Sequence, residues 1–337
     1  MKEPSYKMKK DIFIFKSGSL KRKDNTLYFE NKESKKFLPI TEIDNIYVYG
    51  EVNINKKALD FLAENEILVH FFNYYGYYTG TFYPREHLNS GFVILKQAEY
   101  YLDYSKRLHI AMQILESAIE NLLNNLKYYN RKNTNLENEI ETIDKNREEI
   151  YDTNNIDELM AVEGNIRQKY YQCFNKILQK EEFYFEKRSK RPPKDKINAL
   201  ISFGNSLMYS AVLGEIYKTH LDPRIGYLHS TNNRRFSLNL DISEIFKPII
   251  TDRTIFTILN KNQLSNNDFR ESFHGILLNE KGQRKFVETF NEKLTTVIKH
   301  PKLNKYISYK TLIRMQLYKL QKHITENEEL IFFKGRW

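Results

Sequence analysis

The segment Pro84-Arg85-Glu86-His87-Leu88-Asn89-Ser90-Gly91 separates two parts of the chain that differ in their sequence period. Before it, short apolar runs rich in aromatic and β-branched residues are divided by turn residues, which is typical of β-strands. After it, apolar residues recur about every 3.6 positions over long stretches, which indicates amphipathic helices. We therefore expect an α+β protein, with a β-rich domain at residues 1–88 followed by a larger all-α domain at residues 89–337.

Each part divides further at turn-forming and polar residues. The N-terminal part predicts one short helix at residues 57–65 and strands near residues 11–15, 20–23, 26–30, 37–40, 46–49, 67–72 and 77–83. Asp24-Asn25 suits a tight hairpin turn between two of these strands. The C-terminal part predicts helices at residues 92–128, 156–185, 195–218, 241–250, 283–299 and 306–325. Residues 131–155 are rich in Asn, Glu and Lys and predict a solvated helical excursion or loop.

The overall composition bounds the class of protein. The 337 residues include 53 Lys and Arg against 43 Asp and Glu, a net charge of +10. This charge favours an anionic partner, either nucleic acid or an acidic membrane surface, although a general bias toward Lys, Asn and Ile accounts for it equally well. The single cysteine, Cys173, excludes an internal disulfide and any zinc-ribbon or iron–sulfur site. Because no apolar run reaches the roughly 20 residues of a membrane span, we expect a soluble, cytoplasmic protein without membrane partners.

A carboxylate falls on the apolar stripe of the helix predicted at residues 156–178. Leu159 and Ile166 belong to this stripe, and Glu163 lies between them at helical spacing. A carboxylate on a core-facing stripe is costly to desolvate unless a cation compensates its charge. Two kinds of cation could serve, either Arg167 one helical turn later or a bound metal ion. Periodicity alone favours the ion pair with Arg167 or a partly exposed position.

A basic segment, defined here as residues 187–196, follows this helix. Its cations are Lys187, Arg188, Lys190, Arg191, Lys194 and Lys196. Asp195 is the acid that opposes them, and we place it at the N-cap of the next helix. That helix, Ile197–Tyr217, is apolar on nearly every side and is therefore expected to be buried at the centre of the second domain. Basic runs are usually solvated surface, but this one contains Pro192-Pro193 and leads directly into the buried helix.

Three further candidates lie at and after a turn at residues 221–229. His229 ends this segment, and a lone histidine of this kind is more often structural than a metal ligand. Asp241 and Glu244 follow at a spacing of three, so they share one face of the helix predicted at residues 241–250. Two acids near a helix N-terminus stabilise the helix dipole, and they could also hold a divalent cation.

Several separate blocks of sequence together resemble one family. From about Met8 onward, the chain is similar to the CRISPR-associated adaptation integrases, the metal-dependent nucleases of spacer acquisition. The resemblance is carried, in the family's order, by Gly18–Leu27, Ile40–Gly50, Tyr83–Glu86, Met160–Gly164, Arg191–Gly204, Leu221–His229, Ser237–Pro248 and Asp252-Arg253. The blocks of the N-terminal part look most like the branch found with type I, subtype B systems.

The resemblance implies a metal site in the second domain. By motif position its ligands are Glu163, His229 and Glu244, and Asp241 matches the family's supporting acid in the catalytic set. Two carboxylates and one imidazole suit Mg²⁺ or Mn²⁺. Spacing along the chain alone could never identify this set, because its members are far apart in the sequence.

The resemblance also implies a reaction and its partners. In this family a DNA 3′-OH attacks a target phosphodiester, the reverse reaction resolves branched DNA, and water as the nucleophile gives nuclease activity. The chain is therefore expected to bind double-stranded and branched DNA, to form a homodimer through the β-rich domain, and to assemble with the small ferredoxin-like CRISPR-associated adaptation partner. Phosphate contacts are expected from the basic residues that flank the ligand blocks: Lys187, Arg188, Lys190, Arg191, Arg234, Arg235 and Arg253.

Two other functions compete with this interpretation. A catalytically silent DNA-binding scaffold is the main alternative, and the presence of all three ligand types argues against it. A basic RNA-binding protein fits the charge, but no aromatic signature for stacking bases on a sheet is evident. A further expectation concerns stability: if Glu163 and Glu244 repel one another without metal, replacing either with Ala leaves the metal-free protein folded or even more stable.

Overall fold

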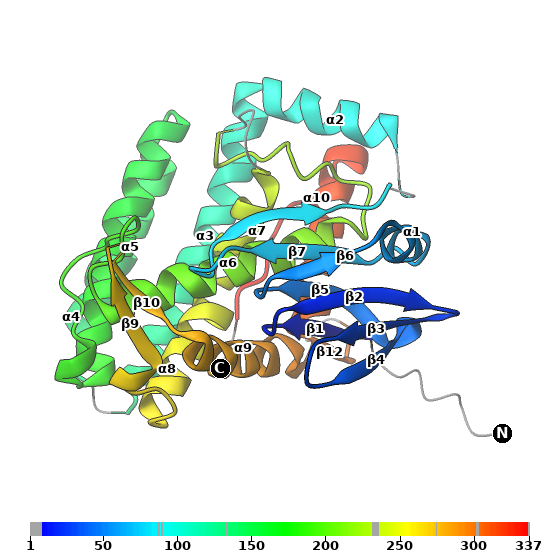
Figure 1. Ribbon diagram of the computed structural model, residues 1–337. Helices are drawn as coiled ribbons and strands as arrows, with labels where there is room; N and C mark the ends of the chain where they lie inside the picture. Colours follow the sequence, from blue (N-terminus) through cyan, green and yellow to red (C-terminus); the bar gives the residue numbers. More distant parts are fainter. Residues whose placement is uncertain are drawn as a thin grey trace. The chain divides into compact units, whose positions relative to one another are not determined.

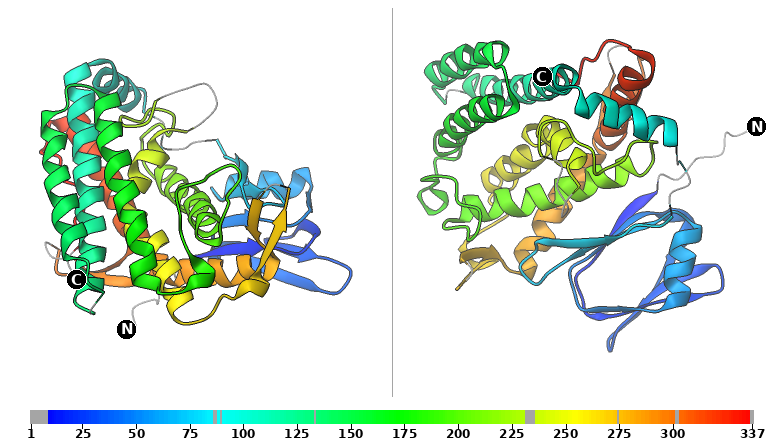
Figure 2. Two further views of the ribbon diagram at one scale, coloured as in Figure 1. Left: turned by 90° about the vertical axis from the view of Figure 1, so that its left-hand side faces the viewer. Right: turned by 90° about the horizontal axis from the view of Figure 1, so that it is seen from above.

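Figures 1 and 2 show the computed structural model of the chain, which describes residues 9–335 except residues 86, 87, 89, 133, 231–235, 274, 301 and 302. The chain divides into two compact units between residues 87 and 88. The N-terminal unit is rich in β-strands and the C-terminal unit is mainly helical. The mixed α+β class expected from the sequence is therefore confirmed.

Two four-stranded sheets and one α-helix form the N-terminal unit. Its elements are β1 (Lys10–Ile14), β2 (Gly18–Lys23), β3 (Thr26–Glu30), β4 (Lys35–Pro39), the 3-10 turn η1 (Ile40–Glu42), β5 (Ile43–Val48), β6 (Val52–Ile54), α1 (Lys56–Glu64), β7 (Leu68–Phe72) and β8 (Tyr78–Phe82). The first sheet has the order β1-β5-β7-β8, in which β8 runs antiparallel to β7 and the other pairs are parallel. The second has the order β4-β3-β2-β6, in which β6 runs parallel to β2.

The buried faces of these strands follow from the alternation of apolar residues. Leu20 of β2, Leu27 of β3, Ile46 of β5 and Val69 of β7 are buried in one apolar core, together with Leu62 of α1. Successive residues of a strand point to opposite faces, so a register shift of one residue would expose this set. Burial of these side chains therefore specifies how the strands pair.

The hairpin predicted at Asp24-Asn25 is present between β2 and β3. Lys23 pairs with Thr26, which leaves two residues in the turn, and Asp24 adopts a φ of 51°. Positive φ values of this kind are tolerated by Asp and Asn in tight hairpin turns. The strand β6 was not predicted, because three residues are too few to show a period of two.

The C-terminal unit contains α2 (Gly91–Leu102), α3 (Tyr104–Asn130), α4 (Glu137–Glu148), η2 (Glu149–Asp152), α5 (Ile156–Leu178), η3 (Glu181–Phe183), α6 (Lys196–Ile216), α7 (Leu238–Phe246), the π-helical turn η4 (Pro248–Asp252), α8 (Arg253–Asn260), η5 (Asn266–Asp268), α9 (Glu280–Thr295) and α10 (Tyr309–Glu326). The long helices α3, α4 and α5 pack alongside one another (Figure 2). The helix predicted at residues 92–128 is broken at Asp103, whose side chain caps α3 by accepting a hydrogen bond from the Lys106 backbone N–H at 3.0 Å.

The C-terminal unit is not all-α as predicted, because it also contains two short β-hairpins. β9 (Phe269–Ser272) pairs antiparallel with β10 (Gly275–Leu278), and β11 (Val297–Lys299) pairs antiparallel with β12 (Tyr306–Ser308). Strands of three or four residues are too short to show a strand period, so the helical period of their surroundings dominated the prediction. The first hairpin supports the basic segment, because the backbone N–H of Ile276 donates to the Pro193 carbonyl at 3.0 Å.

The helix α6 lies at the centre of the C-terminal unit and is buried on nearly every side, as predicted. Asp195 is confirmed as its N-cap, since its Oδ1 accepts a hydrogen bond from the Asn198 backbone N–H at 2.7 Å. α7 and η4 pack against both α6 and α3, so the residues of α7 are held from two sides. Within the part of the chain that the structure describes, no helix is both long enough and apolar enough to cross a membrane.

Candidate metal centre

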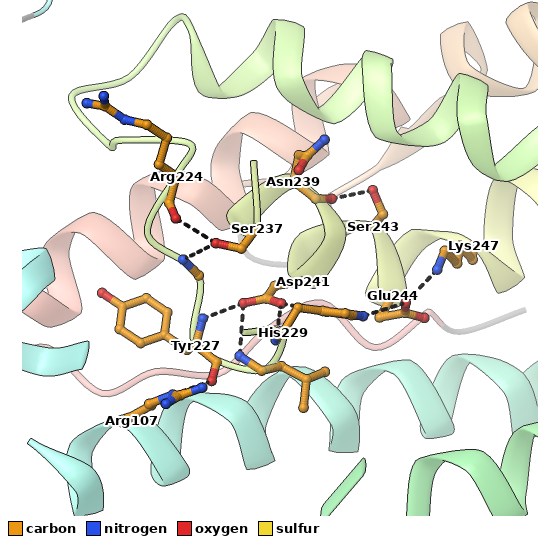
Figure 3. A network of polar contacts seen from close by, with 12 residues as sticks. Arg107, Arg224, Tyr227, His229, Ser237, Asn239, Asp241, Ser243, Glu244 and Lys247 are labelled. Atoms are coloured by element: carbon orange, nitrogen blue, oxygen red, sulfur yellow. Dashed lines mark hydrogen bonds and ion pairs between the residues drawn. The ribbon is translucent and has the colours of Figure 1, made fainter. Parts of the chain in front are cut away.

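Asp241 on α7 fixes the position of His229. Its Oδ1 accepts hydrogen bonds from His229 Nδ1 at 2.8 Å and from the His229 backbone N–H at 2.9 Å (Figure 3). Its Oδ2 accepts from the backbone N–H groups of Tyr227 at 2.5 Å and Leu228 at 3.0 Å. Because a carboxylate only accepts, Nδ1 of His229 carries the proton and Nε2 faces Glu244, whose Oε1 lies 3.9 Å away. Metal-ligating histidines are commonly held by such a carboxylate.

The loop that carries His229 is anchored at three points. A Cβ at Gly226 would lie 2.7 Å from Asp241 Oδ2, so only glycine leaves room for that carboxylate. Ser237 Oγ accepts a hydrogen bond from the Gly226 backbone N–H at 2.8 Å. Gln97 of α2 donates to two carbonyl groups of the same loop, at 2.9 and 2.7 Å. The imidazole is therefore preorganised by the fold.

Arg167 joins the other two predicted ligands, Glu163 and Glu244. Its Nε donates to Glu163 Oε1 at 3.0 Å and its Nη2 donates to Glu244 Oε2 at 2.6 Å. Glu163 and Arg167 lie one turn apart on α5, whereas Glu244 lies on α7. The side chains of Glu163, Arg167 and Glu244 are only 18%, 11% and 7% exposed. The ion pair weighed for Glu163 is thus present, and it belongs to a larger buried cluster.

Glu244 is surrounded by positive charge. Besides Arg167, the buried Lys247 donates from Nζ to Glu244 Oε1. Burial raises the pKa of Glu244, but Lys247, Arg167 and His229 outweigh burial and lower that pKa below its ordinary value. Burial likewise lowers the pKa of His229, but Asp241 outweighs it and the net direction is upward. The stability expected from the sequence assumes that Glu163 and Glu244 repel one another when no metal is bound. In the structure, positive side chains compensate both carboxylates.

Asp252 adds another buried carboxylate to this cluster. It ends η4, where its backbone N–H donates to the Lys247 carbonyl at 2.9 Å, one residue further back than in an α-helix. Burial raises the pKa of Asp252 to about 7, although the positive charge of Arg167 and a hydrogen bond from Tyr170 oppose this shift. Among the described residues, Asp252 Oδ2 has no hydrogen-bond partner, and neither has Nη1 of the buried Arg167. Buried unpaired polar atoms are rare and often mark functional positions.

The chemistry of the donor set fits a hard divalent cation. Among the described residues, no three His, Cys, Asp or Glu side chains are arranged to hold a metal as they stand. Arg167 occupies one carboxylate oxygen of each of Glu163 and Glu244, and Lys247 holds the other oxygen of Glu244. The two carboxylates and the Nε2 of His229 nevertheless belong to one cluster, and oxygen ligands with one imidazole suit Mg²⁺ or Mn²⁺.

The basic segment presents several of the predicted DNA contacts. Lys187, Lys190 and Arg191 are exposed. Although the Lys190 side chain is exposed as a whole, partial burial of its ammonium and the neighbouring cations lower its pKa, while Glu163 and Glu244 oppose this shift. Lys190 is thus within electrostatic reach of the carboxylate cluster. A DNA phosphate bound to this lysine would therefore lie near the candidate metal centre.

The other predicted contacts are placed differently. The guanidinium of Arg188 donates to Asn198 Oδ1 at 2.7 Å, so this residue helps to shape the basic segment. The guanidinium of Arg253 lies over the ring of Tyr128, with its Cζ 5.2 Å from the ring centroid. Two predicted contacts, Arg234 and Arg235, lie outside the described residues.

Sequence reasoning missed part of this site. Lys247 follows Glu244 at a spacing of three, a helix-surface signal that could have identified their ion pair. The contact between Arg167 and Glu244 joins residues 77 positions apart and has no local signal. The same holds for Asp252, which lies 85 positions after Arg167 and acts on its charge only in the folded chain.

Comparison with known proteins decides the family. The family model described as CRISPR associated protein Cas1 matches residues 12–292 of the chain. The chain belongs to the Cas1 family. The family resemblance is therefore confirmed, whereas the assignment to the type I, subtype B branch stays a prediction.

Individual Cas1 proteins agree with this assignment. CRISPR-associated endonuclease Cas1 2 of Thermodesulfovibrio yellowstonii is 54% identical over 330 residues, which are 98% of this chain and 100% of the relative. A solved Cas1 structure from Thermotoga maritima has a TM-score of 0.87 at 43% identity and covers 97% of this chain and 100% of its own. A casposase bound to an integration product has a TM-score of 0.87 at 22% identity, over 97% of this chain and 94% of its own, and shows the fold alone. The chain therefore has the Cas1 fold and belongs to a family of CRISPR-associated endonucleases.

Proposed function

We propose that this Cas1 protein is a metal-dependent DNA integrase and endonuclease that inserts DNA fragments into a CRISPR array. The reaction is attack of a DNA 3′-OH on a phosphodiester, with nuclease activity on branched or other DNA. The observation that carries the proposal is the cluster in which Asp241 orients His229 toward Glu244 while Glu163 is joined to the same carboxylate through Arg167. The relative named an endonuclease supports it, and the casposase shares the fold.

Each residue of the cluster has a distinct role in this proposal. Glu163, His229 and Glu244 hold Mg²⁺ or Mn²⁺, and Asp241 keeps the proton of His229 on Nδ1 so that Nε2 can ligate. When bound, such a cation stabilises negative charge on a phosphate and lowers the pKa of an attacking hydroxyl. Lys190 attracts the phosphate backbone toward the cluster.

The decisive experiment is strand transfer into a plasmid or branched DNA with Mn²⁺, with and without a chelator. We expect joining by the wild-type chain with Mn²⁺ and none with the chelator. His229→Ala should lose joining but retain DNA binding, because the basic segment is unaffected. Lys319→Ala, a change on α10, serves as the control and should join DNA like the wild type. Unchanged joining in His229→Ala would contradict the metal site, and DNA binding without joining in the wild type would favour the silent scaffold.

The proposed partners are DNA, a second copy of the chain and the small ferredoxin-like adaptation partner. A solved protein that shares the fold at 20% identity belongs to a Cas6-RT-Cas1–Cas2 complex, which is a precedent for such assembly. The N-terminal unit is the proposed dimerisation module. It exposes large apolar side chains, among them Phe37 at 50% and Tyr74 at 72%.

Sedimentation of the full chain tests this dimer. We expect a dimer at tens of micromolar, and a shift toward monomer when Phe37 and Tyr74 are both replaced by Ser. The matched control replaces Phe92 and Leu102, which are 59% and 80% exposed in the C-terminal unit. A monomeric wild type, or equal effects of both double variants, would contradict a dimer formed through the N-terminal unit.

The finer assignment to type I, subtype B systems is also a proposal. It is supported by the sequence blocks Gly18–Leu27 and Ile40–Gly50. Strand transfer into leader–repeat DNA from several CRISPR subtypes tests it. We expect preference for the subtype B repeat, and an equal or greater preference for another subtype would contradict the assignment.

A further inference from the structure

Arg167 occupies one carboxylate oxygen of each of two proposed metal ligands, Glu163 and Glu244. Its guanidinium holds Glu163 Oε1 and Glu244 Oε2 at 3.0 and 2.6 Å, in a cluster that is almost closed to solvent. A divalent cation and a guanidinium compete for the same carboxylates and repel each other at this range. The charge of Arg167 therefore opposes binding of a cation between Glu163 and Glu244, and binding becomes more favourable when Arg167 gives up one of these contacts.

The structure also offers Arg167 an alternative partner. Within the part of the chain that the structure describes, its Nη1 donor makes no hydrogen bond, and the Oδ2 acceptor of buried Asp252 makes none either. Arg167 and Asp252 each appear among the charges that act on the other, so the two side chains lie within electrostatic reach. Buried polar atoms are costly to leave unpaired, and a second arrangement that pairs this donor with this acceptor would satisfy both.

We propose that Arg167 is an exchangeable cation that neutralises Glu163 and Glu244 in the metal-free protein and turns to Asp252 when a divalent cation binds. This inference rests on the proposed function, because it requires a metal at Glu163, His229 and Glu244. In this proposal Arg167 is a positioning residue, and Asp252 is the hydrogen-bond acceptor that favours binding of the metal. The two residues then affect metal affinity in opposite directions, which a merely structural role for both does not predict.

The test is a Mn²⁺ titration of the full chain without DNA, with free Mn²⁺ measured by electron paramagnetic resonance. We expect Arg167→Gln to bind Mn²⁺ about tenfold tighter than the wild type, because the competing charge is gone. Asp252→Asn should bind several-fold more weakly, because Arg167 has lost its second partner. The matched control is Arg147→Gln on α4, which removes another partly buried arginine, paired with Glu120 at 2.7 Å, and should change the affinity less than twofold.

The outcomes separate this inference from the proposed function. Equal or weaker Mn²⁺ binding in Arg167→Gln than in Arg147→Gln would overturn the exchange, as would unchanged binding in Asp252→Asn. Equal Mn²⁺ binding by His229→Ala and the wild type would overturn the metal site itself. If Arg167→Gln does not fold, Arg167→Lys replaces it, because a single ammonium cannot bridge both carboxylates as the guanidinium does. Arg167→Lys should bind Mn²⁺ about threefold tighter than the wild type. An unchanged Mn²⁺ affinity would again overturn the proposed exchange.

Discussion

Asp241 accepts three backbone hydrogen bonds and one from the His229 ring, whereas Arg167 and Asp252, in the same cluster, each keep a polar atom with no hydrogen-bond partner among the described residues. The side of the cluster around Asp241 is complete before any ligand arrives. The side around Arg167 is held by ion pairs whose positive charge opposes a bound metal ion. This difference indicates that the imidazole is built to stay in place and that the charged side chains opposite it are built to rearrange.

The largest effect is expected from a substitution at Asp241, on the fully hydrogen-bonded side of the cluster. Asp241→Ala leaves three backbone N–H groups without an acceptor and frees the His229 ring, so both folding stability and joining should be lost. We expect a destabilisation of roughly 3–5 kcal/mol, measured by thermal or chemical denaturation. The control is Asp144→Ala, which removes a carboxylate that is 48% exposed on α4. Wild-type stability in Asp241→Ala would contradict the view that this carboxylate organises the loop.

The next test compares the two carboxylates bound to Arg167. Glu244→Ala leaves Arg167 and Lys247 buried without their shared partner, so we expect a loss of about 3–5 kcal/mol. Glu163 is more exposed and pairs only within α5 among the described contacts, so Glu163→Ala should cost no more than about 1 kcal/mol. Both variants should lose strand transfer with Mn²⁺. Equal melting temperatures of the two variants would show that Glu244 does not hold the two cations.

The smallest effect concerns the basic segment and leaves the cluster intact. Replacing Lys187 and Arg191 with Gln should reduce the slope of log affinity against log salt by about 1.8, at roughly 0.9 for each phosphate contact. Replacing Lys16 and Lys56, which are 55% and 87% exposed in the N-terminal unit, is the charge-matched control. DNA binding across a salt series measures both. An equal reduction in both double variants would show that the basic segment has no special role.

Local features were the ones that the sequence could predict. The hairpin turn at Asp24-Asn25 and the N-cap at Asp195 were both correct, because each depends on a few adjacent residues. The short strands β6 and β9–β12 were missed, since three or four residues show no period. The break at Asp103 was also missed, because the apolar period continues across it and only the cap ends the first helix.

The candidate site required information that no local pattern contains. Resemblance to the family, not spacing, selected Glu163, His229 and Glu244, and their role as ligands stays a prediction. The pairing of Arg167 with Glu163 could be read from helical spacing. The pairing of Arg167 with Glu244 could not, because it depends on how α5 packs beside α7. The unpaired atoms of Arg167 and Asp252 depend on packing in the same way.

The central claim is that Glu163, His229 and Glu244 form a single divalent-cation site. Anomalous diffraction from a crystal soaked in Mn²⁺ tests it most directly. We predict one strong anomalous peak per chain, roughly 2.0–2.4 Å from His229 Nε2 and from a carboxylate oxygen of each glutamate. Arg167 should then have left Glu244 Oε2, where it now lies at 2.6 Å. No peak at these three side chains, with Mn²⁺ bound elsewhere or not at all, would contradict the claim.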